Sequence, residues 1–326
     1  MKNRSIISAG DFIELYGKLK LNNLPNLLQK LSPRQSERVI STWNVQDKGN
    51  SNWWIVPQVR ARLNELMTGD ANVVYEEYLV KKYLADKQDL TLLSIGCGTG
   101  THELRLAHSG KFGLVEGWDI APKLIEQCKH EATTQSLTNT AFRVVDVNRS
   151  TPQQDAYDVV LFNSSLHHFS DIESMIRDKV LPALRDKGLL FVYEYIGPNR
   201  LQWTDEQLTL CDEALRLIPK AFRQYQWGAH KSRVYRPGVL RMVVNDPSEA
   251  ANSRAILPIL RSYLQPLEEK PVKGNILHPL LKGIAHNFLA PSSESDRILQ
   301  DLFTFEDKAV TTVDDSDFMF GVYQKG

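Results

Sequence analysis

The sequence has few cysteines, no long apolar run and no excess of charge of either sign. Three cysteines stand far apart among 326 residues, without a Cys-x-x-Cys pair. This argues against a disulfide framework or a zinc site and suits a reducing compartment. The apolar runs are the length of strands, too short to span a membrane. Lysine plus arginine equals aspartate plus glutamate, at 39 each, so we expect a cytoplasmic protein without a nucleic acid or membrane partner.

The patterns that are present divide the chain into two parts. Residues 1–89 have helical spacing over 12–19 and 59–67, interrupted by a polar stretch at 47–52, and predict a helical N-terminal extension that acts as a lid. Residues 90–326 predict a ligand-binding domain with cap insertions at about 197–262 and 274–312. Long connectors of this kind usually form structure of their own.

Strand and helix patterns alternate from residue 90 to 196. Strands are expected at 91–95, 113–118, 142–146, 157–163 and 189–195, and helices at 122–132 and 172–184. Further on, the sequence predicts a helix over 204–217 capped by Thr204, another over 249–264, and a closing strand at 318–324. The alternation predicts an α/β protein with a mostly parallel sheet covered on both faces, whose ligand binds at the carboxyl ends of the strands.

A glycine-rich turn follows the first of these strands. Gly96, Gly98 and Gly100 give the spacing G-x-G-x-G, which differs from the G-x-G-x-x-G of dinucleotide-binding folds. Glycine permits a tight turn and a close approach of a ligand to the backbone, and the helix that follows offers N–H groups to it. Without other signals, an ordinary strand–helix turn would explain the same pattern.

Three polar residues follow the next strands in order. Asp119, after the second strand, can accept hydrogen bonds from ribose hydroxyls, and Asp146, after the third, from an adenine amino group. Asn163 ends the fourth strand. Any one of them can be a simple strand terminator or helix cap, but all three in order favour a nucleoside site at this edge of the sheet.

The run from Leu92 to Tyr195 resembles the class I S-adenosylmethionine (SAM)-dependent methyltransferases, especially their small-molecule branch. The segments that carry the resemblance are 95–100, 117–122, 145–147 and 165–171. It implies a Rossmann-like sheet of seven strands, the last antiparallel, with SAM as cofactor. The residues expected to bind SAM are Gly96, Cys97, Gly98, Gly100, Glu103, Asp119, Ile120, Asp146, Val147, Asn163 and Ser164. Segments 194–204 and 246–250 more loosely resemble uncharacterised bacterial methyltransferases near polysaccharide or natural-product genes.

One position departs from the family pattern. The family usually has an acid two residues before the first glycine, whereas this chain has Ser94. Glu103, in the first turn of the following helix, can supply the missing negative charge to the methionine ammonium group. The alternative is that Glu103 only offsets the helix dipole.

The acceptor side of the predicted site contains a histidine and a glutamate. His167 follows the fourth strand, where many O-methyltransferases have their catalytic histidine, and can act as a general base for a hydroxyl. A structural role in the pocket is the alternative. Glu194, at the end of the fifth strand, can orient or deprotonate the acceptor, or pair with a cation such as Arg200. We expect O-methylation of a small molecule in natural-product biosynthesis, with a sugar or a natural-product hydroxyl or carboxylate as acceptor.

Other functions stay open from the sequence. They are N-methylation, modification of a peptide, NAD-dependent oxidoreduction and SAM binding without catalysis. The basic segment 228–233 can meet an acidic substrate or be a solvated loop. No clustered ligand set predicts a metal, and the oligomeric state is not predicted.

Overall fold

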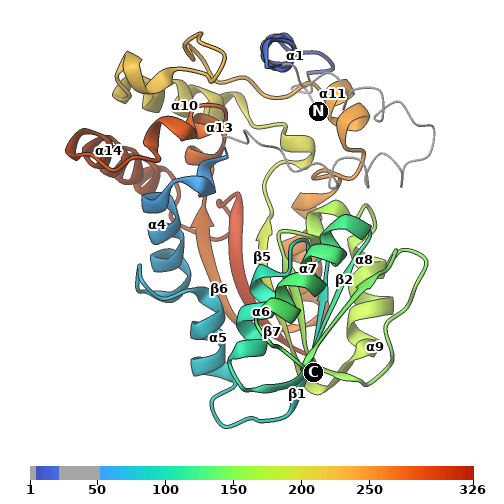
Figure 1. The fold of residues 1–326 in the computed structure, drawn as a ribbon. Helices are drawn as coiled ribbons and strands as arrows, with labels where there is room; N and C mark the ends of the chain where they lie inside the picture. The colour runs from blue at the N-terminus through green and yellow to red at the C-terminus, as the bar shows by residue number, and fades with distance from the viewer. Residues whose placement is uncertain (1–4, 22–51) are drawn as a thin grey trace. The chain divides into compact units, whose positions relative to one another are not determined.

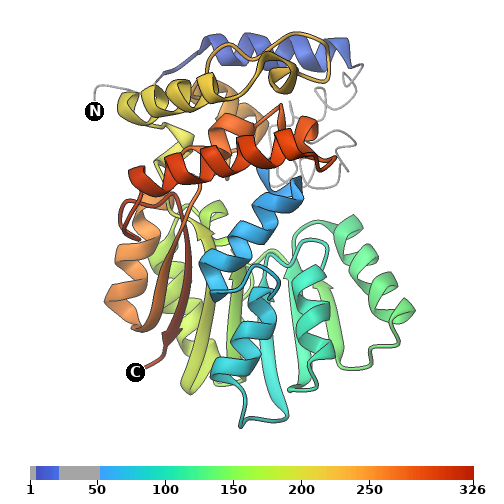
Figure 2. The same ribbon diagram turned by 90° about the vertical axis from the view of Figure 1, so that its left-hand side faces the viewer.

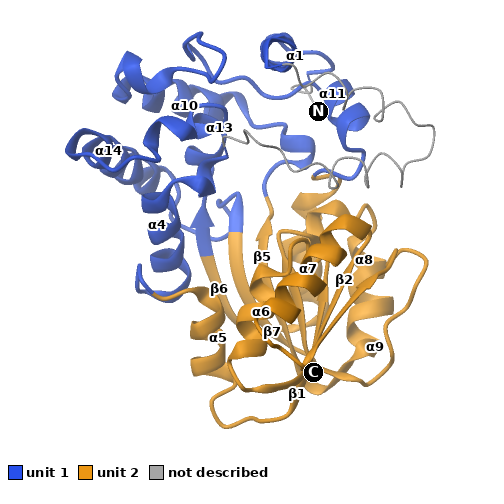
Figure 3. Ribbon diagram, viewed as in Figure 1, with its two compact units in different colours: residues 1–72, 197–249, 271–318 blue, residues 73–196, 250–270, 319–326 orange. Residues whose placement is uncertain are grey.

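The computed structural model describes residues 5–21 and 52–326, which form two compact units (Figure 3). Unit 1 comprises residues 1–72, 197–249 and 271–318, and unit 2 comprises 73–196, 250–270 and 319–326. The predicted extension ended at residue 89, whereas the division falls after Asn72. Of the predicted polar stretch at 47–52, all but Asn52 lies outside the described residues. The roles of the extension and the cap insertions as a lid stay predictions.

A seven-stranded sheet dominates unit 2, in the order β3-β2-β1-β4-β5-β7-β6. The pairs β3–β2, β2–β1, β1–β4 and β4–β5 are parallel. The backbone N–H of Lys325 donates to the carbonyl of Gly188, and that of Gly197 donates to the carbonyl of Asp317. The later residue along β5 thus pairs with the earlier residue along β7, so the two strands are antiparallel. The strands are β1 (Leu90–Ile95), β2 (Phe112–Asp119), β3 (Thr140–Val144), β4 (Tyr157–Asn163), β5 (Leu184–Tyr195), β6 (Gln265–Lys273) and β7 (Phe318–Gln324).

Helices cover both faces of this sheet. On one face lie α5 (Tyr75–Tyr83), α6 (Thr101–His108) and α7 (Pro122–Thr134) (Figures 1 and 2). On the other lie α12 (Ile256–Tyr263) and a continuous helical stretch made of α8 (Ile172–Ser174), a π-helical segment (Met175–Val180) and α9 (Leu181–Ala183). The central strands β1 and β4 are buried almost throughout. Their near-continuous apolar sequences follow from this double cover.

The predicted Rossmann-like fold class is confirmed, with six of the strands at or near their expected places. The prediction named no range for β6, and the reason is its composition. This edge strand contains Glu268, Glu269 and Lys270 between two prolines, residues that edge strands tolerate and that blunt them against aggregation. Glu268 accepts hydrogen bonds from the hydroxyls of Tyr78 and Tyr83 on α5, each at 2.7 Å.

Three other boundaries were predicted wrongly. The fifth strand begins at Leu184 and not at residue 189. The third strand ends at Val144 and not at Asp146. The helix expected over 249–264 begins only at Ile256. Its proposed start is instead a turn in which the Asp246 side chain accepts from the backbone N–H of Ser248 at 2.9 Å. Such local side-chain bonds compete with helix formation.

Unit 1 is mainly helical. Its longer helices are α1 (Ala9–Lys20), α4 (Pro57–Thr68), α10 (Asp205–Leu217), α11 (Val239–Asn245), α13 (Leu277–Leu281) and α14 (Ser293–Ala309). The predicted cap of α10 is confirmed, because the Thr204 hydroxyl accepts from the backbone N–H of Gln207 at 3.0 Å.

Glu306 on α14 is fully buried and binds the start of α13. Its Oε1 accepts from the backbone N–H groups of Ile276 and Leu277, at 2.9 and 3.0 Å. A carboxylate at this place satisfies helix N–H groups that have no partner within the helix. Glu306 therefore links α14 to the start of α13 through two buried hydrogen bonds.

We expect Glu306→Ala to lower the free energy of unfolding by about 2–4 kcal/mol, because two buried N–H groups lose their acceptor. Glu306→Gln keeps an acceptor oxygen and should cost less. Urea denaturation of both variants measures the difference, with Asp301→Ala, an exposed acid on the same helix, as the control. A loss in Glu306→Ala no larger than in the control would contradict this role.

Candidate cofactor and active site

The glycine turn joins β1 to α6. Gly96, Gly98 and Gly100 have φ of 77°, 55° and 73°, backbone conformations that favour glycine. A side chain at Gly96 would place its Cβ 2.6 Å from Cβ of Ser165, whereas at Gly98 it would meet no atom within 4 Å. The first glycine thus permits close packing, and the backbone at the second faces open space that a ligand can approach.

Cys97 contributes to this turn through its backbone. Its side chain is buried in a cluster with Leu104, Ile125, Cys128, Ala132 and Phe142. Its backbone N–H donates to the carbonyl of Trp118 at 3.0 Å. The thiol therefore packs in the core, and only the main chain at position 97 is placed to line the turn.

Asp119 links the glycine turn to the end of β2. Its Oδ2 accepts from the backbone N–H of Gly98 at 2.9 Å and its Oδ1 from that of Ala121 at 2.8 Å. Burial raises the pKa of Asp119, and the backbone N–H groups oppose that shift. Each carboxylate oxygen can accept more than one hydrogen bond, so the group is held in place and can still accept from two ribose hydroxyls.

Glu103 reaches back to the position where the family acid is missing. The Ser94 hydroxyl donates to Glu103 Oε1 at 2.5 Å, and the Glu103 side chain is 1% exposed. Burial raises the pKa of this carboxyl. Within the described residues, Oε2 is buried without a hydrogen-bond partner. A buried acid with an unsatisfied oxygen fits a cationic ligand such as the SAM ammonium group.

Asp146 lies two residues beyond β3 and shapes its own turn. Its Oδ1 accepts from the backbone N–H of Asn148 at 3.0 Å, and its other oxygen lies 3.5 Å from Nε of Arg149. The backbone N–H of Val145 donates to the carbonyl of Asp119 at 2.9 Å, which brings the two turns together. Ile120 is half-buried and Val147 buried beside them. The contact of Asp146 with adenine stays a prediction.

Asn163, at the end of β4, is held by a residue that sequence analysis missed. Tyr75 on α5 donates its hydroxyl to Asn163 Oδ1 at 2.9 Å, and its ring stacks on His102 of α6. Ser164 follows in a left-handed conformation, with φ of 51°, and its N–H donates to the carbonyl of Tyr193. The sequence signal for Tyr75 is weak, because it stands in a helix upstream of every motif.

His167 and Glu194 form a buried pair. Glu194 Oε1 contacts His167 Nδ1 and accepts from the backbone N–H of Tyr195. Its Oε2 accepts from the N–H groups of Ser165 and Leu166, at 2.9 and 2.6 Å. Sequence analysis also offered an ion pair between Glu194 and Arg200. The Arg200 guanidinium instead donates to the carbonyls of Pro247 and Glu249. Glu194 therefore positions the histidine and its turn.

Fold and turn together define a nucleoside-binding edge of the Rossmann type, and comparison with known proteins gives the family. Residues 86–238, just under half of the chain, match the model of a methyltransferase domain family. These residues form a methyltransferase domain of the class I type, the class that uses SAM as its methyl donor.

Two curated relatives and one solved structure illustrate the similarity. Aklanonic acid methyltransferase DauC of Streptomyces sp. strain C5 is 35% identical over 24% of this chain and 37% of its own length. Malonyl-[acyl-carrier protein] O-methyltransferase 1 of Ilyobacter polytropus is 24% identical over 49% of this chain and 62% of its own length. The structure of geranyl diphosphate C-methyltransferase from Streptomyces coelicolor A3(2) is 13% identical, with a TM-score of 0.48, over 91% of this chain and 99% of that one.

The chain thus matches less than two thirds of the length of either curated relative. In the part of the chain that the structure describes, no helix combines the length and apolar character needed to cross a membrane.

We expect Asp119→Ala to weaken binding of S-adenosylhomocysteine at least about tenfold, because the ribose loses a charged acceptor. Isothermal titration calorimetry of the wild type and the variant measures the change. Glu126→Ala, an exposed acid on α7, is the control and should bind like the wild type. Equal affinity in Asp119→Ala would remove Asp119 from the cofactor site.

Proposed function

We propose that this protein transfers a methyl group from SAM to a hydroxyl group of a small molecule, with His167 as the general base. The observation that carries this proposal is the buried contact between Glu194 and Nδ1 of His167. A carboxylate at Nδ1 favours the tautomer with its proton there, which leaves the basic lone pair on Nε2.

Bound SAM would supply an electrophilic methyl group on a sulfonium. The residues that fit it are Asp119 for the ribose, Glu103 for the ammonium group and the open backbone at Gly98. His167 Nε2 would take the hydroxyl proton as the oxygen attacks, and Glu194 would stabilise the resulting imidazolium. The protein's further task is alignment of donor and acceptor.

A second candidate acceptor is a carboxylate. Two of the relatives are named for aklanonic acid and for a malonyl group on acyl carrier protein, which favours an acidic acceptor. A carboxylate is already ionised near neutral pH and needs no base. The two candidates therefore differ in what removal of His167 should do. Natural-product biosynthesis in the cytoplasm is the setting that we propose for either.

We expect His167→Ala to lower kcat on a hydroxyl acceptor by about 10²–10⁴-fold, while S-adenosylhomocysteine affinity stays near that of the wild type. In the wild type kcat should rise with pH as the base loses its proton, and the variant should lose that rise. A screen of hydroxylated aromatic compounds, sugars and carboxylic acids, with formation of S-adenosylhomocysteine as readout, supplies the acceptor. His130→Ala, an exposed histidine on α7, is the control.

Glu194→Gln should lower kcat less than His167→Ala, because the base remains in place, although the single amide oxygen can accept only part of the backbone bonds and no longer carries the charge that stabilises the imidazolium. Unchanged kcat in His167→Ala with an active hydroxyl acceptor would refute the base. Activity on carboxylic acids alone, insensitive to His167, would favour the second candidate. If the protein binds the cofactor but methylates none of the aromatic compounds, sugars or carboxylic acids, the result would favour a SAM-binding protein without catalysis.

A further inference from the structure

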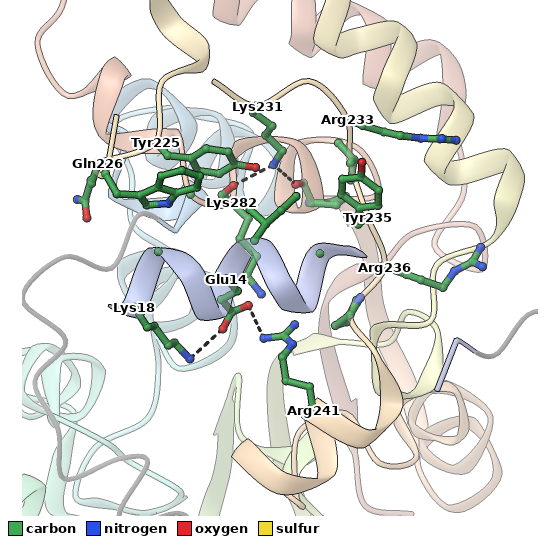
Figure 4. A pocket seen from close by; sticks show the side chains of 18 of the residues that line it. Glu14, Lys18, Tyr225, Gln226, Lys231, Arg233, Tyr235, Arg236, Arg241 and Lys282 are labelled. Atoms are coloured by element: carbon green, nitrogen blue, oxygen red, sulfur yellow. Dashed lines mark hydrogen bonds and ion pairs between the residues drawn. The ribbon is translucent and has the colours of Figure 1, made fainter. Parts of the chain in front are cut away.

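Unit 1 contains a cavity of its own, with a volume of about 260 Å³ (Figure 4). It is lined from α1, from the segment 225–237, from α11 and from the end of α13. A water molecule in the liquid occupies about 30 Å³, so the cavity has room for on the order of ten non-hydrogen atoms. Every residue that lines it belongs to unit 1.

Basic side chains outnumber acidic ones around this cavity. Its lining includes six lysines and arginines but a single acid, Glu14. Four of the six have acid partners: Lys18 with Glu14, Arg233 with Asp212, Arg236 with Asp205, and Arg241 with Asp11 and Glu14. Lys231 and Lys282 have no ion pair within the described residues. The six basic side chains thus face four acids, and the two that have no ion pair among the described residues are both lysines.

The two lysines differ in how they are used. Lys231 donates to the carbonyls of Pro279, Leu280 and Lys282, at 2.8–2.9 Å, which uses all three of its N–H groups and fixes the end of α13. The Lys282 ammonium makes no hydrogen bond within ranges 5–21 and 52–326, and Figure 4 shows it on the side of the cavity that holds Glu14. Lys282 is therefore the group able to bind an anion directly.

Burial and neighbouring charges act on the pKa values of these groups. Burial lowers the pKa of Lys282 and brings that of Lys231 to about 7. Burial alone would raise the pKa of Glu14, but Lys282, Arg241 and Lys18 outweigh it and lower the value to about 2. Glu14 is thus ionised, and a ligand carboxylate at Lys282 would share that lysine with it, while Arg241 and Lys18 remain paired with Glu14.

Aromatic rings form a wall of the cavity. Tyr225 and Trp227 stack with centroids 5.1 Å apart and an interplanar angle of 7°, and Tyr16 meets Trp227 edge-on. Glycine makes room for this wall, since a Cβ at Gly17 would lie 2.7 Å from Nε1 of Trp227. Flat, rigid rings of this kind favour a planar aromatic ligand.

Trp203 adds an unused donor to the lining. It is 2% exposed, and its indole Nε1–H is buried without a hydrogen-bond partner among the residues described. A buried donor without a partner costs free energy unless something accepts from it. Trp203 is one of the residues that line the cavity.

We propose that this cavity is a second small-molecule site, which takes a planar aromatic ligand bearing a carboxylate. The carboxylate would bind Lys282, and the ring would pack on Tyr225 and Trp227. The site stands on unit 1 alone, and the proposal holds whether or not the chain transfers methyl groups. The basic segment 228–233 thereby gains a role, since Lys231 and Arg233 line the site.

The test uses 2-naphthoate and its neutral counterpart 2-naphthalenemethanol, titrated into the full chain by calorimetry. We expect the wild type to bind the carboxylate at least about tenfold more tightly than the alcohol, and added salt to reduce that preference. Lys282→Met should bring the carboxylate down to the affinity of the alcohol. Lys308→Met, an exposed lysine on α14, should leave both affinities unchanged.

Three results would overturn the proposal. They are equal affinity for the two compounds, no binding of either to the wild type, and an intact preference in a folded Lys282→Met variant. If a variant fails to fold, the comparison of the two probes on the wild type still tests the proposal. Asp119→Ala, which is expected to weaken the cofactor site of unit 2, should still bind naphthoate. If this variant loses naphthoate binding, the probe binds the cofactor site, and the proposed site in unit 1 is refuted.

Discussion

The described architecture of the active edge depends on one buried carboxylate. Glu194 is fully buried, and its two oxygens bind three backbone N–H groups and the His167 ring. A buried charge without such donors would be strongly destabilising. The turn after β4 and the histidine beside it are therefore fixed by the same residue. A part of Glu194 in catalysis stays a prediction, whereas its contacts with this turn and with the His167 ring are what the structure shows.

Much of the fold could be predicted because its signals are local. Apolar strands, the glycine turn and the Thr204 cap each depend on a few neighbouring residues, and each was found. What escaped prediction depends on distant partners or on competing local bonds. Strand β6 is charged because it lies at a sheet edge, and the Asp246–Ser248 bond displaces a helix start that the sequence suggested. Tyr75 reaches Asn163 from 88 residues upstream, and no periodicity reveals that.

The two units follow different physical rules. In unit 2, polar side chains at the ends of buried strands make hydrogen bonds to backbone turns, which holds the site rigid. In unit 1, the cavity is lined by long cationic side chains and by rings packed on glycine. Backbone N–H groups hold the side chains of the first site, whereas ion pairs with acids hold four of the six cations around the second.

The pairing of Ser94 with Glu103 constrains how such a site can change over time. Glu103 is the acid that we propose for the ammonium group, and it comes from the helix, whereas the family pattern has its acid on the strand; the Glu103 side chain contacts that of Ser94. An aspartate at 94 would set two carboxylates against each other in a buried place, while loss of Glu103 alone would leave no acid at all. Neither single step is neutral. The two positions therefore have to be changed together if the site is to keep one buried acid.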